Sequence, residues 1–300
     1  MTAATERSAP VPTRSRRPTG GDSRRLRSPG VRAGQYVVLA LYLIFLAFPL
    51  VWLLSVSLKG PQELASIAPR LIPRHWDWRN YSDAFSQQGL VRSALNSTIV
   101  AAASTLLTIV VATPTAYALA RFRTRLRGAA TAWILVSQLF PVILIVIPLF
   151  MILRDLHLLN SLGGLVLVYL VWTLPFALWM LRGYIAAIPP DLEQAAAVDG
   201  AGRLRILVSV VLPLLRPGLV ATAMFAFISA WNEFFFALVL LRGDQTTLPL
   251  NLARFVGSEG QVSLGPLAAA SVLATLPSLA VFAFLQRRLA SGLLSGAVKG

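Results

Sequence analysis

Six long apolar stretches, separated by polar segments, run along the chain. Each is about twenty residues long, the length of a helix that crosses roughly 30 Å of hydrocarbon. The pattern therefore predicts an all-α, polytopic membrane protein with six transmembrane helices. The expected spans are about 36–58, 94–120, 130–153, 162–181, 219–241 and 267–285.

The N-terminal segment, residues 1–35, is rich in Arg, Pro, Ser, Thr and Gly and has almost no large apolar side chain. Such a segment cannot bury enough surface to offset the entropy lost on ordering, so we expect a disordered basic cytoplasmic tail. The pairs Arg16-Arg17 and Arg24-Arg25 also fit a twin-arginine export signal. The apolar stretch that follows is too long for a signal core and lacks a small-residue cleavage site, so we expect it to remain as the first span.

Basic residues set the expected orientation. With the basic tail inside, 19 of the 27 Lys and Arg residues lie in segments that six spans would place in the cytoplasm. This bias agrees with the positive-inside rule. We therefore expect cytoplasmic N- and C-termini in a bacterial plasma membrane, and a cytoplasmic loop between the fourth and fifth spans.

Composition agrees with a membrane protein and limits the possible partners. The chain is 56% hydrophobic and 13% charged, whereas a soluble domain is about 25% charged. A net charge of +15 fits nucleic-acid binding in a soluble protein, but no groove of basic and aromatic residues accompanies it. We expect membrane lipid around the chain and no nucleic-acid partner.

The chemistry of an enzyme or a metalloprotein is not visible in the sequence. The chain has no cysteine, which excludes disulfides and thiolate metal sites. His75 and His157 are both expected outside, and no helix carries a histidine-carboxylate cluster suited to a metal. Lys59 and Lys299 lack the preceding glycine of a phosphate-binding loop. We therefore expect no catalytic residue, metal or cofactor, and no ATP hydrolysis by this chain.

The longest polar break in the second half of the chain is the loop 183–217. Asp191 can cap a helix there, and Gln194 can reach back to complete a capping box. Gly200 offers a left-handed stop. We expect a helix of about two turns over 192–199, which is too short to be stable alone in water.

This short helix either links two spans on the surface or docks on a partner. Its centre, which includes Ala195 and Ala196, is small enough for another backbone to come close, and Glu193 and Asp199 flank it with negative charge. A second short helix is expected over 203–211, leading back into the membrane.

The spacing of the loop favours docking, because it resembles the EAA motif of the membrane subunits of bacterial ABC importers. That motif reads Glu-Ala-Ala, three residues, Gly, nine residues, Ile, one residue, Leu-Pro. Gln194 stands at the usual Glu position, with Glu193 one place before it, and Val210 replaces the Ile. The positions that match are Ala195, Ala196, Gly200, Leu212 and Pro213.

In that family, the loop forms a coupling helix that sits in a cleft of the cytoplasmic ATPase subunit. The resemblance therefore implies that 193–200 transmits nucleotide-driven closure to the membrane helices. The ATPase-coupling residues implied are Glu193, Gln194, Ala195, Ala196, Asp199, Gly200, Leu212 and Pro213.

Other stretches are similar to carbohydrate-uptake permeases of the MalG type, and this similarity covers about 35–300. They are Ser57-Leu-Lys-Gly60, Asn80-Tyr81, Trp231-Asn-Glu-Phe-Phe235 and the ending Gly296-Ala-Val-Lys-Gly300. The resemblance implies the type I ABC permease fold over 36–300, with its transmembrane core at about 91–286. It also implies one half of the path of an ATP-driven sugar importer. The implied partners are a second, MalF-like permease, two copies of a cytoplasmic ATPase and an extracytoplasmic sugar-binding protein.

Trp231, Asn232 and Glu233 are candidates for the substrate path. A carboxylate within a transmembrane run is costly and usually faces the bundle interior or a wet cavity. The oxygens of Asn232 and Glu233 can accept sugar hydroxyl hydrogens, and Trp231 offers a stacking face. The alternative is a structural hydrogen bond to a neighbouring helix.

Two further alternatives stay open at this point. Prolines within the spans fit a bundle that rocks between two shapes, but prolines are also common in membrane helices. The solute could be an amino acid or phosphate instead of a sugar, and a membrane scaffold without a substrate is the alternative outside transport.

Overall fold

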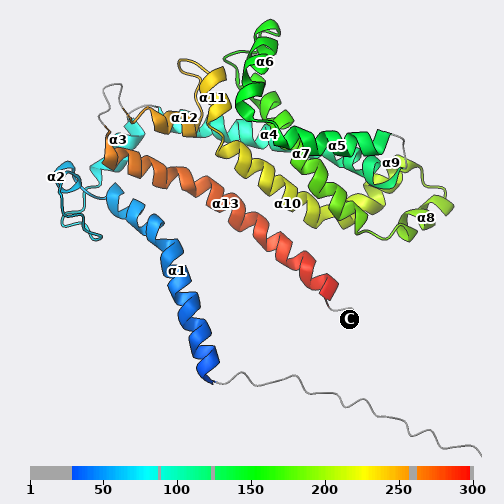
Figure 1. Cartoon of the computed structure of the whole chain (residues 1–300), viewed down its shortest axis with the longest axis horizontal. Coiled ribbons are helices and arrows are strands. Elements are labelled where there is room, and N and C mark those ends of the chain that lie inside the picture. The colour runs from blue at the N-terminus through cyan, green and yellow to red at the C-terminus, as the bar shows by residue number, and fades with distance from the viewer. Residues whose placement is uncertain (1–28, 87–88, 123–125, 257–261, 298–300) are drawn as a thin grey trace, which may run out of the picture. The chain divides into compact units, whose positions relative to one another are not determined.

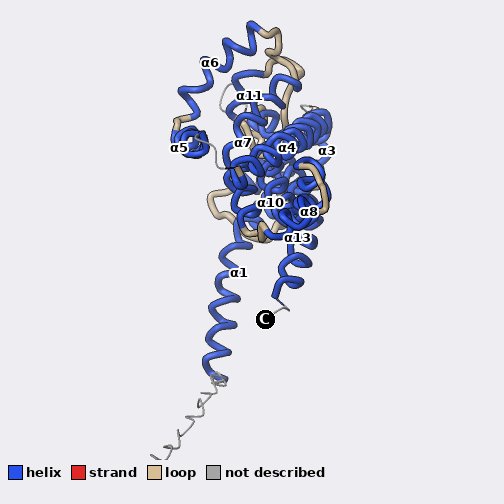
Figure 2. Tube along the Cα trace, turned by 90° about the vertical axis from the view of Figure 1, so that its right-hand side faces the viewer, coloured by secondary structure: helices blue, strands red, loops and turns tan. Residues whose placement is uncertain are grey.

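The computed structural model describes residues 29–86, 89–122, 126–256 and 262–297 and divides into two compact units, Met1–Pro49 and Leu50–Gly300. Helix α1 (Pro29–Ser57) crosses the boundary between them. It begins within the segment expected to be disordered, so the prediction was wrong for residues 29–35, while residues 1–28 lie outside the described part. The described residues are helices joined by loops (Figure 2), apart from one isolated bridge between Val256 and Val262.

The other helices follow in chain order (Figure 1). They are α2 (Pro61–Leu64), α3 (Arg79–Ser86), α4 (Leu90–Arg121), α5 (Leu126–Leu139), α6 (Val142–Asp155), α7 (Leu162–Ala186), α8 (Asp191–Val198), α9 (Arg203–Ile206), a π-helical turn (Leu207–Val211), α10 (Leu212–Trp231), α11 (Phe235–Leu240), α12 (Leu248–Ala253) and α13 (Leu264–Ala297).

Among the described residues, five helical segments are long and apolar enough to cross a membrane, and a bent pair makes a sixth if its two halves are counted as one span. This agrees with the six-span prediction and its order along the chain. The five segments are Ala33–Ser57, Leu90–Arg121, Leu162–Ala186, Arg203–Trp231 and Leu264–Gln286. The bent pair is Arg127–Leu139 with Val142–Asp155.

The third span is not the continuous helix that was expected. Its two halves, α5 and α6, meet at an angle of 103° at Phe140 and Pro141. Proline has no N–H to donate and disfavours a helical backbone in the residue before it, which accounts for the break. Pro114 and Pro175 lie inside α4 and α7 without interrupting either helix, so a proline alone does not dictate a break.

The fifth span starts and ends earlier than expected. The second short helix predicted over 203–211 is instead α9 and a π-helical turn, and both continue directly into α10. Helix α10 stops at Trp231, so the expected span of 219–241 is interrupted before α11 begins at Phe235.

Helices α4, α7 and α10 pack against one another in the centre of the second unit, and α13 packs along α10 (Figure 1). A buried hydrogen bond of 2.8 Å joins the hydroxyls of Thr108 on α4 and Thr173 on α7. One apolar cluster surrounds Tyr169 and Trp231. A second cluster, around Leu181 and Val211, lies beneath the loop that carries α8.

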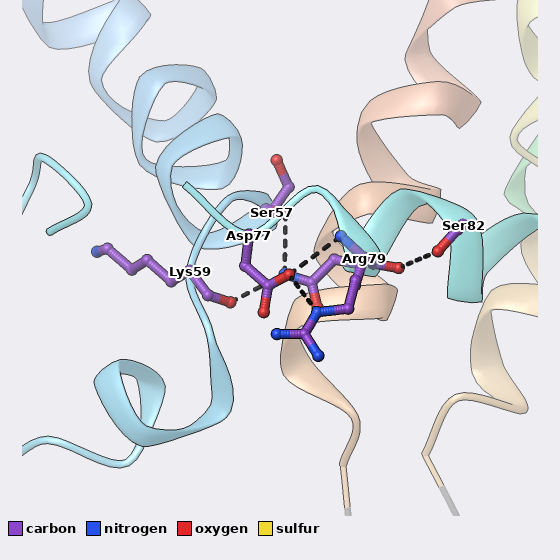
Figure 3. A network of polar contacts seen from close by, with 6 residues as sticks. Ser57, Lys59, Asp77, Arg79 and Ser82 are labelled. Atoms are coloured by element: carbon purple, nitrogen blue, oxygen red, sulfur yellow. Dashed lines mark hydrogen bonds and ion pairs between the residues drawn. The ribbon is translucent and has the colours of Figure 1, made fainter. Parts of the chain in front are cut away.

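Polar contacts fix the last residues of α1 to α3 (Figure 3). The Asn80 amide donates to the carbonyls of Ser57 and Lys59 at 3.1 and 2.9 Å, and Ser57 Oγ lies 2.9 Å from the Tyr81 hydroxyl. Gly265 lets α13 approach this site, because a Cβ there would overlap the Asn80 amide. The structure thus joins two of the short motifs noted in the sequence, Ser57–Gly60 and Asn80-Tyr81.

Candidate functional site

The short helix of the polar loop exists, as α8 over Asp191–Val198, but its first turn is not the predicted capping box. Pro190 is the N-cap residue, and its carbonyl accepts from the backbone N–H groups of Glu193 and Gln194, both at 3.0 Å. Asp191 and Glu193 lie in the first turn, where negative charge is favourable next to the helix dipole.

The end of α8 agrees with the predicted glycine stop. Gly200 has φ +82°, in the left-handed region that a side chain disfavours. Its N–H donates to Ala197 O at 3.1 Å, and the N–H of Ala201 donates to Ala196 O at 3.0 Å. This pair of bonds is the Schellman arrangement, which turns the chain sharply toward α9.

Glu193 points back into the protein and connects α8 to α4. Its carboxylate lies 2.7 Å from Arg121 Nε and accepts the Tyr117 hydroxyl at 2.9 Å. Arg121 also donates to the carbonyl of Ile188 at 2.7 Å. The side chains of Arg121 and Glu193 are 17% and 11% exposed, so the position of α8 relative to α4 is held by a shielded ion pair. Arg121 was expected in the same cytoplasmic region, but its pairing with Glu193 was not, because nothing in a linear sequence links the end of α4 to α8.

The inner side of the loop is also held by apolar and aromatic contacts. Ala196 and Ala201 pack on the apolar cluster beneath the loop. The guanidinium of Arg203 lies 5.0 Å from the centre of the Phe122 ring, a distance within the range of a cation–π contact. Phe122 itself meets Tyr117 edge to face, with ring centres 6.0 Å apart.

The outer side of α8 is exposed. It includes Gln194, Ala195 and Asp199, and Val198 has 88% of its surface accessible. Leu204 on α9 is 74% exposed. Exposed apolar side chains on a short helix that is fixed on its other side are available for a partner to cover.

Leu212 and Pro213, the last two residues of the predicted motif, are not on α8. Both lie in the first turn of α10, which continues the helical run that begins at Arg203. Leu212 is partly buried and Pro213 is exposed. The last part of the predicted motif therefore forms the start of a membrane helix.

The three candidates for the substrate path have different surroundings. Trp231 is 3% exposed, stacks on Phe227 with ring centres 5.9 Å apart, and donates from Nε1 to Ala274 O at 3.3 Å. It offers no open face for a sugar, contrary to the expectation. Asn232 is exposed, and its amide donates to Ile228 O at 2.9 Å.

Glu233 makes the interhelical hydrogen bond that was weighed as the alternative to a substrate contact. Its Oε2 accepts the Tyr169 hydroxyl of α7 at 2.7 Å. Its Oε1 accepts the backbone N–H of Phe236 at 2.8 Å, so the carboxylate caps the first turn of α11. These bonds satisfy a charge that would be costly inside a membrane.

Known relatives of this chain are membrane permeases. A putative ABC transporter permease of Streptomyces antibioticus is 59% identical over 229 residues, which are 76% of this chain and all of the relative. The diacetylchitobiose uptake system permease DasC of Streptomyces coelicolor is 38% identical, covering 86% of this chain and 93% of the relative. The trehalose/maltose transport system permease MalG of Thermococcus litoralis is 36% identical over the same shares.

The fold agrees with a solved transporter. A chain of a bacterial ABC transporter that imports the acidic polysaccharide alginate superposes with a TM-score of 0.73 at 25% identity, over 87% of this chain and 97% of that one. This confirms the predicted type I permease fold. The relatives are transport subunits, so the chain is a membrane permease subunit of an ABC importer and not an enzyme.

Residues 105–295 match the family described as the binding-protein-dependent transport system inner membrane component. This match covers more than half of the chain and includes both the α8 loop and the broken fifth span. The chain therefore belongs to the family of inner-membrane components of binding-protein-dependent transport systems.

Proposed function

We propose that this chain is one of two permease subunits of a sugar importer. The named sugar permeases among its relatives, for diacetylchitobiose and for trehalose or maltose, support a sugar as the solute. The complex would also contain a second permease, two copies of a cytoplasmic ATPase and an extracytoplasmic sugar-binding protein. The charge bias of the sequence supports a cytoplasmic position for both termini.

The α8 loop is the proposed contact with the ATPase. The observation that carries this is its two-sidedness: Glu193 and Ala196 hold α8 to this chain, while Ala195 and Val198 on the outer side remain exposed. A short helix fixed on one side presents its other side to a groove in a partner. In this arrangement Gln194 and Asp199 lie at the polar rim, and Gly200 sets the angle at which the chain leaves the helix.

Coupling would then follow two routes from α8 into the membrane. One route is the ion pair of Glu193 with Arg121, which ends at α4. The other is the continuous helical path from α9 through Leu212 and Pro213 into α10. Closure of the ATPase subunits on ATP would shift α8, and both routes would carry that shift to the helices that open and close the sugar path.

The proposed sugar path includes Asn232 but gives Trp231 and Glu233 other roles. Asn232 is exposed at the helix break and keeps its amide oxygen for a hydroxyl group. Glu233 fixes the break by accepting hydrogen bonds from Tyr169 and from the first turn of α11. The buried Trp231 packs at the α10 side of the break.

Purification of the membrane complex tests the docking proposal. The Val198→Glu variant places a charge where we expect an apolar groove, so the amount of co-purified ATPase should fall about tenfold, as 1.4 kcal/mol of lost affinity would produce. The control is Val256→Glu, which makes the same substitution at an exposed residue on the loop between α12 and α13. Equal ATPase recovery from both variants would contradict docking through α8.

Reconstitution tests the substrate class separately. The complete complex in vesicles should take up radiolabelled trehalose, maltose or diacetylchitobiose in an ATP-dependent way. Uptake of glutamate or phosphate, with none of any of these sugars, would contradict the sugar proposal while leaving the ATPase contact intact.

A further inference from the structure

A cavity of about 280 Å³ lies inside the second unit, between α5, α6, α7, α10 and α11. It is separate from the Asn232 side chain, which is not part of its lining. Its walls are mostly apolar, with a few hydrogen-bonding side chains, the composition of a small-molecule site. The residues that matter here are Ser137, Gln138, Trp172, Phe225, Ser229 and Phe236.

Two helix breaks in the described part of the chain adjoin this cavity. Gln138 precedes the break at Phe140–Pro141, and Ser229 and Phe236 stand on either side of the break between α10 and α11. Non-helical backbone at membrane depth is tolerated only where protein buries it or where it lines a water-filled cavity. Secondary transporters place their substrate sites at such discontinuous helices, and the same physical reason favours a site beside these two breaks.

The polar lining suits hydroxyl groups. The Gln138 side chain is exposed and offers two N–H donors and one carbonyl acceptor. Ser137 donates its hydroxyl to Ile134 O at 2.9 Å, which leaves its oxygen free to accept. Ser229 adds a hydroxyl from α10, so the donors and acceptors come from two different helices.

Aromatic rings form the other wall, and neighbouring rings hold them in place. Trp172 is 43% exposed and its ring meets Phe236 edge to face, with ring centres 5.8 Å apart. Phe225 is stacked on Phe176, with ring centres 3.8 Å apart. A fixed, partly open indole beside amide and hydroxyl groups matches a sugar ring, which has an apolar C–H face and a rim of hydroxyls.

Charge and size narrow the ligand further. None of the described residues that line the cavity is charged, so an ionic solute would enter without a counter-charge. Its volume of about 280 Å³ lies just below the roughly 300–1,000 Å³ of small-molecule sites, which favours one ring over an oligosaccharide. We propose that this cavity holds a single neutral sugar ring during transport, with Gln138 and Ser229 at its hydroxyls and Trp172 against its face. The proposal rests on the sugar function proposed above.

The uptake assay uses the complete complex in vesicles with radiolabelled trehalose, maltose and diacetylchitobiose. Gln138→Leu and Trp172→Leu should each lower uptake about tenfold, which corresponds to 1.4 kcal/mol. ATP hydrolysis stimulated by the loaded binding protein should stay within about twofold, because docking on α8 is unaffected. The matched control is Trp133→Leu, an exposed tryptophan on the same helix as Gln138 but outside the cavity lining. Uptake by both cavity variants equal to that of the control would overturn the proposal.

A second measurement does not depend on disruptive substitutions. Because the chain has no cysteine, Ser229→Cys introduces its one thiol, which a water-soluble thiol reagent can label in the purified complex. The sugar that the complex transports should slow labelling at least fivefold at millimolar concentration, whereas labelling of Ser82→Cys, exposed on α3, should not change. A thiol at 229 that does not react at all, or that reacts equally with and without sugar, would contradict a sugar-filled cavity.

Failure of this proposal is distinguishable from failure of the sugar function. If the wild-type complex takes up glutamate or phosphate and none of the three sugars, the function itself is wrong and so is the proposed site. If it takes up a sugar and the cavity variants match the control, the function stands and only the proposed site is wrong.

Discussion

The Glu193 carboxylate in the first turn of α8 lies 2.7 Å from Arg121 Nε in the last turn of α4. The contact joins α8 to the end of α4, although the two residues are 72 positions apart in the chain. Because both side chains are largely shielded from water, the pair is not an ordinary surface salt bridge, whose contribution would be small. Any movement of α8 must displace α4 or break this contact.

Arg121→Leu should therefore destabilise the α8 corner and weaken coupling. Removing one partner of a shielded pair leaves the other charge unpaired, at a cost of about 3 kcal/mol. We expect a lower thermal unfolding temperature for the complex and less sugar transported per ATP hydrolysed.

The double variant Arg121→Leu/Glu193→Leu is the control for this prediction. Replacing both partners leaves no unpaired charge, so its unfolding temperature should recover toward that of the wild type. A double variant less stable than Arg121→Leu would show that the charges are not what holds the corner.

Gly200→Val should uncouple transport from ATP hydrolysis more severely than Gln194→Ala. The backbone at Gly200 has φ +82°, and a branched side chain there costs about 1–2 kcal/mol. A Cβ at this position would meet nothing within 4 Å, so the damage comes from the changed exit direction of α8 and not from a clash. The ratio of ATP hydrolysed to sugar taken up measures the effect.

Gly202→Val is a matched control for the glycine prediction. Gly202 is two residues away and has φ −69°, and a Cβ added there would also meet nothing within 4 Å. Coupling in this variant should stay near that of the wild type. Equal tolerance of Gly200→Val and Gly202→Val would contradict a conformational role for Gly200.

Gly265→Ala should loosen the junction of α3 and α13 with the end of α1. The added methyl would overlap the side-chain amide of Asn80, which is buried and donates to two carbonyls. Overpacking of this kind costs about 1–3 kcal/mol. The unfolding temperature of the purified complex measures it, and Gly163→Ala, with open space at its Cβ, should have no comparable effect.

Substitutions at Asn232 and Glu233 should have different effects, one on sugar uptake and the other on protein stability. Glu233→Ala removes the acceptor of Tyr169 and the cap of α11, so we expect about 2 kcal/mol of lost stability and less protein in the membrane. Asn232→Ala, at an exposed side chain, should leave protein levels unchanged and alter the concentration dependence of uptake. A stable Glu233→Ala protein with changed sugar preference would instead place Glu233 in the sugar path.

The spans and the α8 helix could be predicted because their signals are local. Apolar length is set within twenty residues, and the stop at Gly200 depends only on its own backbone. The role of Glu193 could not be predicted, since its partners Arg121 and Tyr117 come from another helix. The break at Phe140 was missed because Pro141 looks no different in sequence from prolines that helices accommodate.

The same distinction applies to the fifth span. Asn232 and Glu233 were recognised as unusual for a membrane segment. Because apolar residues continue on both sides of them, the sequence predicted one span and not the end of α10 at Trp231. The helix ends there because Glu233 turns to Tyr169 and to the backbone of α11. Such a partner on a third helix leaves no trace in the local pattern.

The unbroken helical run from Arg203 to Trp231 has a mechanical consequence. At 1.5 Å per residue its 29 residues extend about 43 Å, so a tilt of about 5° about the end near α8 would move the far end sideways by about 4 Å. That displacement is comparable to the width of a methyl group. A rigid-body pivot of one helix would thus be enough to widen or close the space beside Ser229, with no unfolding of the membrane bundle.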